Sequence, residues 1–322
     1  MVKNLKKIIW VFSTELQIPS DLAGCILPAN YLKIPKIIIK QDTNINKILD
    51  SNKPDVIIFG KCLNSNTINL AKEAKKRNIK TISCFNDWHF KAETTKQEKQ
   101  FYLNNILAQN TDHIVVKSLE AGITIKKNTG FSFNVIGDCL RYNSFEISTT
   151  YIKDPKLLWF GSSSNHDTLL MGLNEIEKLK IVSKIFIVTN ISQKLIDKLK
   201  SNYYKYIKLS LISFSEINLI NVAKASSIII MPLIEDHIRF VKSSNRILDS
   251  LNFGKFVIKS KTTYHTELDE YCYVGNIGEG INWYFDNYDK VIEKIKNGKN
   301  FVQNNYSLES IGNQWLKLLN TI

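Results

Sequence analysis

Short runs of β-branched residues alternate with helical stretches along the first half of this chain. This alternation is typical of a parallel sheet whose two faces are covered by helices. Strands are expected at residues 7–12, 36–40, 55–59, 80–84, 113–116 and 133–136, with helices around 44–51, 67–77 and 99–109. The first half therefore predicts an α/β domain.

The same pattern restarts after a polar segment, residues 142–155. Further strands are expected at residues 157–161, 184–190, 208–213, 227–232 and 255–260. Helices are expected after the first of these strands to about residue 179, near 193–201, 216–224 and 245–253, and over 289–319. A chain of 322 residues normally exceeds one compact core, so we expect two doubly wound domains, 1–150 and 151 onward. Ligands of such sheets bind beyond the carboxyl ends of the strands, which favours a site in the cleft between the domains.

The basic charge of the chain comes almost entirely from lysine. The net charge is +13, with 39 lysines and four arginines. An excess of Lys, Asn and Ile with scarce Arg is expected of AT-rich coding sequence, and the lysines do not cluster with aromatic residues as in a nucleic-acid stacking platform. Nucleic-acid binding is therefore disfavoured, and a weak attraction to anionic membrane lipid is the better reading of the charge.

Cysteine usage and apolar runs indicate a cytoplasmic protein. The five cysteines are scattered and none has metal-ligand spacing, so reduced core thiols are expected. The longest apolar run, residues 228–234, is far too short for a membrane span. The apolar run at 8–12 continues into Ser13 without a cleavage site, which predicts a first buried strand rather than a signal peptide.

Two of the four arginines, Arg239 and Arg246, lie within eight residues of each other. They follow an expected strand and flank a helix start that also contains Lys242, Ser243, Ser244 and Asn245. A guanidinium matches phosphate oxygens, and the start of a helix directs its N–H groups at an anion. This segment predicts an anion site; the simpler alternative is a capped surface helix.

Several segments resemble, in the same order, the glycosyltransferases of the GT-B fold. KPDVIIFG, AKKRNIKTISCFNDWHF and ILAQNTDHIVVKSLEAGI resemble the acceptor domain, and KLLWFGSSSNHDTLLMGLNEIEKL resembles the opening of the donor domain. AKASSIIIMPLIED with KSSNRILDSLNFGKFVI resembles the region that contacts the nucleotide sugar, and NYSLESIGNQWLKLL resembles the terminal helix that crosses back. The similarity is greatest to the retaining clan that includes glycogen-synthase-like and bacterial polysaccharide enzymes.

The resemblance implies two facing Rossmann-like domains. Residues 1–150, with a terminal helix at about 306–322, would bind the acceptor, and residues 151–305 would bind the nucleotide-sugar donor. The implied activity is sugar transfer to a glycan or lipid-linked glycan in bacterial-type surface polysaccharide synthesis, with the nucleotide sugar as substrate and no further cofactor. Peripheral association with the inner membrane face would fit such an acceptor.

The resemblance also assigns donor residues and shows two departures. Asp249 stands where the family has a glutamate that accepts ribose hydroxyls, but Val241 stands where it has a first glutamate, so Glu235 or Asp236 would have to substitute. The first donor loop lacks the family's basic residues. Phosphate binding would then fall to Gly161, Ser162, Ser163, Arg239, Lys242, Ser243, Ser244, Asn245 and Arg246.

On the acceptor side, Asp87, Trp88 and His89 end an expected strand. Asp87 or His89 could accept the proton of the acceptor hydroxyl if the enzyme inverts the anomeric centre. In the retaining clan, the resemblance implies that these positions more often orient the sugar while the leaving phosphate assists. Ser13, Thr14, Glu15, Lys117 and Ser118 would face the same cleft.

The chain has no Walker loop, GxGxxG motif or nucleophile elbow, and no convincing DxD metal pair. Metal-independent catalysis is therefore expected, with protein cations in place of a divalent ion. A non-hydrolysing nucleotide-sugar epimerase, a two-lobed small-molecule binding protein without chemistry and a DNA-modifying sugar transferase stay open as alternatives.

Overall fold

The computed structural model describes residues 6–13, 21–60, 64–85, 95–148, 150–181 and 183–322. The chain divides into two compact units. Unit 1 comprises Met1–Arg141, His237–Asn245 and Tyr306–Ile322, and unit 2 comprises Tyr142–Asp236 and Arg246–Asn305. The chain thus leaves unit 1 after Arg141, whereas the sequence placed the boundary at 150, and it returns to unit 1 for residues 237–245 before the terminal helix.

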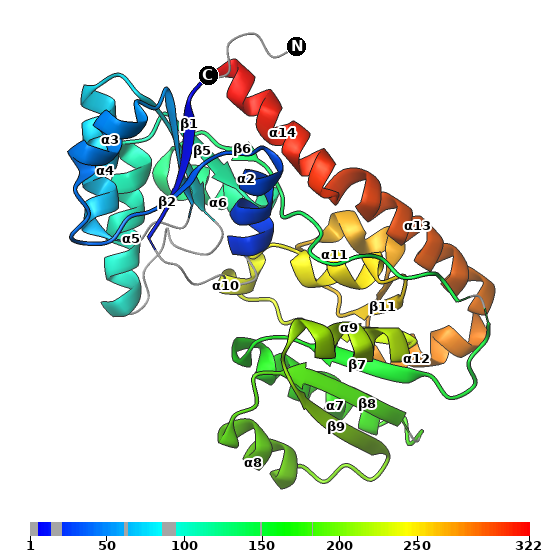
Figure 1. Ribbon diagram of the computed structural model, residues 1–322. Helices are drawn as coiled ribbons and strands as arrows, with labels where there is room; N and C mark the ends of the chain where they lie inside the picture. Colours follow the sequence, from blue (N-terminus) through cyan, green and yellow to red (C-terminus); the bar gives the residue numbers. More distant parts are fainter. Residues whose placement is uncertain (1–5, 14–20, 61–63, 86–94, 149, 182) are drawn as a thin grey trace. The chain divides into compact units, whose positions relative to one another are not determined.

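Unit 1 is built on a parallel sheet with strand order β2-β1-β3-β4-β5-β6 (Figure 1). The strands are β1 (Ile8–Phe12), β2 (Lys36–Ile38), β3 (Val56–Gly60), β4 (Lys80–Phe85), β5 (His113–Val116) and β6 (Asn134–Val135). Their interiors are continuous Ile, Val and Phe runs, as expected for strands buried on both faces. Each strand overlaps the segment predicted from its β-branched residues.

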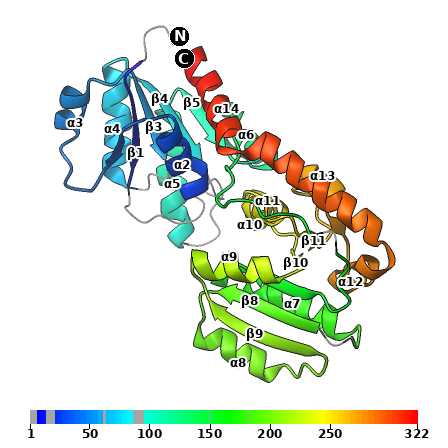
Figure 2. The same cartoon turned by 45° about the vertical axis from the view of Figure 1, so that its right-hand side comes forward.

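Helices cover both faces of this sheet (Figure 2). One face packs against α3 (Ile45–Asn52), α4 (Ser65–Lys76), α5 (Thr95–Gln109) and α6 (Leu119–Thr129), and the other against η1 (Leu22–Ile26), α2 (Leu27–Tyr31) and α14 (Leu308–Thr321). Trp10 of β1 meets Trp315 of α14 edge to face, with ring centroids 4.8 Å apart. A Cβ at Gly312 would lie 2.5 Å from the Tyr31 ring, so this glycine permits the close approach of α14 to α2.

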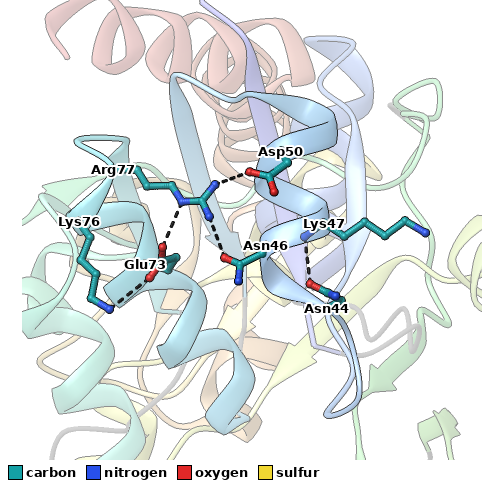
Figure 3. A network of polar contacts seen from close by, with 7 residues as sticks. All are labelled: Asn44, Asn46, Lys47, Asp50, Glu73, Lys76 and Arg77. Atoms are coloured by element: carbon teal, nitrogen blue, oxygen red, sulfur yellow. Dashed lines mark hydrogen bonds and ion pairs between the residues drawn. The ribbon is translucent and has the colours of Figure 1, made fainter.

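One of the four arginines serves only the surface of unit 1. Arg77, at the end of α4, bonds to Asp50 Oδ1 at 2.6 Å and to Asn46 Oδ1 at 2.8 Å on α3, and to Glu73 Oε1 at 3.1 Å on its own helix (Figure 3). Hydrogen bonds from Arg77 and Lys76 lower the pKa of the Glu73 carboxyl. The network fastens α3 to α4 and leaves Arg77 no part in an anion site.

Unit 2 contains a second parallel sheet, with strand order β12-β11-β10-β7-β8-β9. Its strands are β7 (Lys156–Phe160), β8 (Ser183–Thr189), β9 (Ile207–Ser213), β10 (Ile228–Met231), β11 (Phe256–Lys259) and β12 (Tyr273–Val274). The helices are η2 (Ser163–Asn165), α7 (His166–Glu177), α8 (Gln193–Ser201), α9 (Glu216–Ala225), α11 (Asn245–Asn252), η3 (Thr266–Tyr271), α12 (Ile277–Asp286) and α13 (Tyr288–Tyr306). Two parallel sheets with interleaved helices confirm the predicted fold class.

The sequence did not predict α2, α6, α12 or β12. In α6 and α12 the reason is glycine, which lowers helix propensity by about 1 kcal/mol per residue. Here the glycines serve packing: a Cβ at Gly122 of α6 would lie 2.2 Å from the Phe133 ring, and one at Gly280 of α12 would lie 2.5 Å from Ile258. Both helices form because tertiary contacts outweigh their weak intrinsic preference.

Candidate functional site

The strand order of unit 2 marks one place for a ligand. The chain runs from β7 outward to β8 and β9, then returns to β10 on the other side of β7. The loops after β7 and β10 therefore lead to opposite sides of the sheet, and the position between these two strands is called the switch point. Open α/β sheets bind ligands at a switch point, beyond the carboxyl ends of the strands. The two loops are residues 161–165 and 232–236.

Arg246 and Gly161 meet at this switch point. Arg246 lies in the first turn of α11 and is half-buried, and its Nη1 donates a hydrogen bond to the carbonyl oxygen of Phe160 at 3.0 Å. A Cβ built on Gly161 would lie 3.0 Å from that Nη1 and 3.1 Å from the Trp159 ring. The strand therefore ends in a turn without a side chain, directly beneath a guanidinium. A guanidinium can donate to an anion, and a turn without a Cβ lets a ligand approach the backbone, so the pair is a candidate anion site.

A histidine and a threonine hold the Gly161 turn from inside the unit. Thr189 Oγ1, at the end of β8, donates to the Gly161 carbonyl at 2.7 Å and lies 2.9 Å from His166 Nε2. Because the hydroxyl has one proton and gives it to Gly161, it accepts from His166, whose Nε2 carries hydrogen. Burial and Lys198 lower the pKa of His166, which favours the neutral ring. His166 begins α7, and neither His166 nor Thr189 is among the site residues predicted from the sequence.

The serine loop that follows Gly161 is polar and accessible. Ser162, Ser163 and Ser164 are exposed, and the Ser162 and Ser164 hydroxyl oxygens lie 2.9 Å apart. Asn165 Nδ2 donates to Ser162 Oγ at 3.2 Å. The loop thus presents hydroxyl groups beside Arg246 at the carboxyl edge of the sheet, where the sequence expected phosphate ligands.

The loops after β10 and β11 are joined by three hydrogen bonds. The Leu233 amide donates to Ser260 Oγ at 3.0 Å, and the Tyr264 hydroxyl donates to the Ile234 carbonyl at 3.0 Å. The amide of Thr263 donates to Glu235 Oε1 at 2.5 Å. Glu235, considered from sequence as a substitute sugar ligand, therefore holds a backbone amide of the neighbouring loop in this structure.

Lys259 and His265 lie at and after the carboxyl end of β11, and neither was predicted from the sequence. Lys259, the last residue of β11, is fully buried, forms an ion pair with Asp269 and donates to the His265 carbonyl at 3.1 Å. His265 is 4% exposed and has a left-handed backbone with φ 58°. A lysine that ends an otherwise apolar strand, FVIK, was the available signal, because a buried lysine needs a partner.

Arg239, the other arginine of the predicted anion site, belongs to unit 1. Arg239, Lys242, Ser243, Ser244 and Asn245 all lie in the 237–245 segment of unit 1. Within that segment Val241 is 3% exposed and packs in the hydrophobic core of unit 1. The position where the resemblance predicts a sugar-binding glutamate is thus occupied by a core residue. Gly161, Ser162, Ser163, Arg246 and Asp249 belong to unit 2.

The acceptor-side candidates fall largely outside the described residues. Asp87, Trp88 and His89 lie there, as do Thr14 and Glu15. Lys117 is described and is buried: it is 5% exposed and donates to the Gly24 carbonyl at 2.8 Å. Burial opposes its charge, but Cys25 and Asp138 more than offset this, and the pKa of Lys117 is raised. Lys117 therefore serves the interior of unit 1. Ser118 caps α6 by accepting from the Ala121 amide at 3.2 Å.

Asp249, on α11 and 1% exposed, carries a prediction of its own. We expect Asp249→Asn to weaken nucleoside diphosphate binding by on the order of 1.5–3 kcal/mol, because it removes a charge-assisted hydrogen-bond acceptor while keeping the side-chain shape. Calorimetric titration of both proteins with UDP measures the effect. The wild type should also bind UDP more tightly than its 2′,3′-dideoxy analogue; equal affinity for the two ligands would exclude a ribose contact.

Comparison with solved structures finds proteins that are similar to this chain in fold. No family model and no curated protein matches the sequence. Among solved structures, a glycosyltransferase from Rickettsia africae is similar over 97% of both chains, with TM-score 0.68 and 16% identity. An E. coli protein bound with UDP-2-fluoro glucose is similar over 98% of this chain and 99% of its own, with TM-score 0.67 and 10% identity.

A third structure matches over part of a longer protein. It is an S. aureus TarM mutant in complex with fondaparinux, alpha-GlcNAc-glycerol and UDP, which is similar over 86% of this chain and 58% of its own, with TM-score 0.63 and 12% identity. At these identities the similarity shows the fold. Two parallel six-stranded sheets, matched along nearly the whole chain, establish that this protein has the GT-B fold.

Proposed function

We propose that the protein is a glycosyltransferase that moves a sugar from a nucleotide-sugar donor to a glycan or lipid-linked glycan in bacterial-type surface polysaccharide synthesis. The observation that carries the proposal is the Arg246 guanidinium beside the Gly161 turn, at the switch point of the unit 2 sheet. A diphosphate needs a cation, and a turn without a Cβ lets it approach the backbone closely. The similar structures with UDP, or with a UDP sugar, support this choice of ligand.

A thermal-shift panel tests the proposal. UDP, GDP, ADP and dTDP are compared with their glucose or mannose conjugates, and a ligand at 100 times its dissociation constant adds about 2.7 kcal/mol of stability. Stabilisation by one base, with and without its sugar, is the expected result. If none of these ligands stabilises the protein, the proposal is wrong. Incubation of the stabilising donor with the enzyme then separates transfer from epimerisation, which would change the sugar and leave the conjugate intact.

Catalysis in this proposal uses the cations of the chain in place of a divalent metal. Arg246 lies at the switch point, where its guanidinium would offset the negative charge that develops on the leaving diphosphate. Turnover that persists after treatment with EDTA is the expected result. Activity that disappears with EDTA and returns with Mg²⁺ or Mn²⁺ would refute this part of the proposal.

We also propose that the protein is cytoplasmic and associates with anionic membrane through unit 1. The two units differ sharply in charge: unit 1 has 24 basic and 13 acidic residues, a net charge of +11, whereas unit 2 has 19 and 17, a net charge of +2. On α6, Leu119 and Ile123 are 57% and 53% exposed one turn apart, followed by the exposed Lys126 and Lys127. None of the described helices is both long and apolar enough to cross a bilayer.

The membrane proposal predicts a specific loss of binding. A lysine near an anionic surface contributes about 1 kcal/mol, so replacing Lys126 and Lys127 by glutamine should weaken binding to phosphatidylglycerol vesicles by roughly thirty-fold. Vesicle flotation measures it, with phosphatidylcholine vesicles as the uncharged comparison. The matched control replaces Lys198 and Lys200, exposed near the end of α8 in unit 2. Equal losses in both pairs, or a stronger affinity for nucleic acid than for vesicles, would contradict an α6 membrane surface.

A further inference from the structure

His265 is a buried histidine with one ring nitrogen that lacks a hydrogen-bond partner among the described residues. It lies in the loop after β11, is 4% exposed, and its Nδ1 has no hydrogen-bond partner within the described part of the chain. Its ring packs edge to face against Tyr264, with centroids 4.9 Å apart and planes at 83°. Buried polar atoms in folded proteins are nearly always paired, so an unpaired nitrogen beside a ligand site suggests a partner that arrives with the ligand.

Two cations from different elements act on His265, and one of them, Lys259, donates to the His265 carbonyl at 3.1 Å. Burial, Lys259 of β11 and Arg246 of α11 together lower the pKa of His265 to about 3, so the imidazole is neutral at physiological pH. Asp269 of η3 forms an ion pair with Lys259, and Glu235 accepts from the Thr263 amide of the His265 loop. Lys259 also faces the thiol of Cys272, whose pKa burial raises to about 12, so it stays uncharged.

The place of His265 in the sheet connects it to the switch point. Strand β10 lies between β11 and β7, and Arg246, bonded to Phe160 at the end of β7, also acts on the His265 ring. The loop of His265 is held to the β10 loop by the Tyr264 and Thr263 hydrogen bonds. The His265 loop is therefore fastened to the loop after β10, at the same carboxyl edge of the sheet as Arg246, with the imidazole buried in it.

We infer that His265 is a ligand of the donor diphosphate and that it takes up one proton when the diphosphate binds. The inference rests on the proposed function and extends it to a residue that the sequence had not suggested. The proton comes from the solvent: an O–H bond of hydronium, or the acidic bond of a buffer acid, breaks, and an N–H bond forms on the imidazole. The new N–H group donates a hydrogen bond to a phosphate oxygen, and the bonds of the diphosphate do not change.

The reason for the proton uptake is electrostatic. Without an anion, Arg246 and Lys259 repel a third positive charge, which is why the pKa of His265 is low. A bound diphosphate offsets both cations and favours the imidazolium, so the pKa in the complex is higher than in the free protein. Between these two pKa values the complex holds more protons than the free protein, and by linkage the affinity increases as the pH falls, by at most tenfold per pH unit for one proton.

UDP-glucose is a suitable probe because its diphosphate diester does not titrate near neutral pH. Calorimetric titrations in two buffers with different ionisation enthalpies count the protons taken up, and repeating them from pH 8 down to about pH 5.5 gives the slope of affinity against pH. We expect uptake approaching one proton for the wild type and a loss of both uptake and slope in His265→Asn. The control is His113→Gln, which removes a half-buried histidine of unit 1 and should keep both.

A measurement on the unmutated protein guards against a folding defect in the variant. The ¹³Cε1 and ¹H resonances of His265, followed by NMR with pH, should show a neutral ring in the free protein and a protonated ring in the UDP-glucose complex at the same pH. A ring that stays neutral in the complex would overturn the inference.

The two proposals fail in different ways. If UDP-glucose binds, requires Arg246 and shows no proton uptake, the inference on His265 is wrong and the donor site stands. If neither UDP-glucose, the other sugar nucleotides of the panel nor inorganic pyrophosphate binds, both are wrong.

Discussion

Arg246→Ala should weaken binding of the nucleotide-sugar donor and of the free nucleoside diphosphate by roughly 2–5 kcal/mol, the cost of removing one partner of a buried charged pair. Arg246 is the guanidinium that stands over the Gly161 turn and bonds to the Phe160 carbonyl. Isothermal titration of wild type and variant measures the change. We expect the loss to be similar for the donor and the diphosphate, because the contact is made to phosphate.

Three variants make this result specific. Arg77→Ala removes an arginine that only fastens α3 to α4, so it should leave nucleotide affinity unchanged. Arg246→Lys keeps the charge without the planar fork and should recover part of the affinity. Lys242→Ala tests whether the 237–245 segment contributes a cation as well, since its sequence predicts this. Unchanged affinity in both Arg246→Ala and Lys242→Ala would refute the phosphate site.

Alanine at Asp87 or His89 should lower turnover by roughly 10²–10⁴-fold, the usual contribution of a positioned acid or base. The resemblance predicts both residues at the end of a strand of the acceptor domain, whereas Arg246 and Gly161, the proposed phosphate contacts, belong to unit 2. Donor affinity should therefore change little. The measurement compares kcat with the dissociation constant of the nucleotide for each variant, once a donor and an acceptor are known.

The conservative variants Asp87→Asn and His89→Gln sharpen this comparison. They keep shape and hydrogen bonding while removing the basic group, so a proton-accepting residue stays impaired and a merely packing residue recovers. Near-normal kcat in both alanine variants, or nucleotide affinity that falls as steeply as kcat, would remove this segment from the acceptor site.

The parallel sheets could be predicted because their signal is local. A strand buried on both faces must be apolar throughout, so VIIFG, HIVV and SIIIM indicate strands without knowledge of their neighbours. The helices of unit 2 that begin with a Ser cap and continue amphipathically, such as α8, were predicted for the same reason. Helices α6 and α12 were not predicted, because Gly122 and Gly280 weaken the helical signal. These glycines leave room for the side chains of Phe133 and Ile258, which lie outside the two helices in the sequence.

The candidate site likewise contains residues that local sequence could indicate and contacts that only the folded sheet creates. Gly161 and Arg246 could be singled out because a glycine after a strand and a scarce arginine at a helix start are local features. That Arg246 bonds to Phe160, 86 residues away, and that Thr189 joins His166 to Gly161, depends on strands that become neighbours only in the folded sheet.

The sequence by itself thus determined the two α/β halves and singled out the segments of the candidate anion site, because strand composition and helix starts depend on neighbouring residues. Tertiary structure alone decided that residues 237–245 join unit 1, with Val241 in its core. It also decided that Lys259 and His265 are buried. Burial depends on elements that meet only in the folded unit, so the sequence offered a single local signal, the lysine that ends an apolar strand.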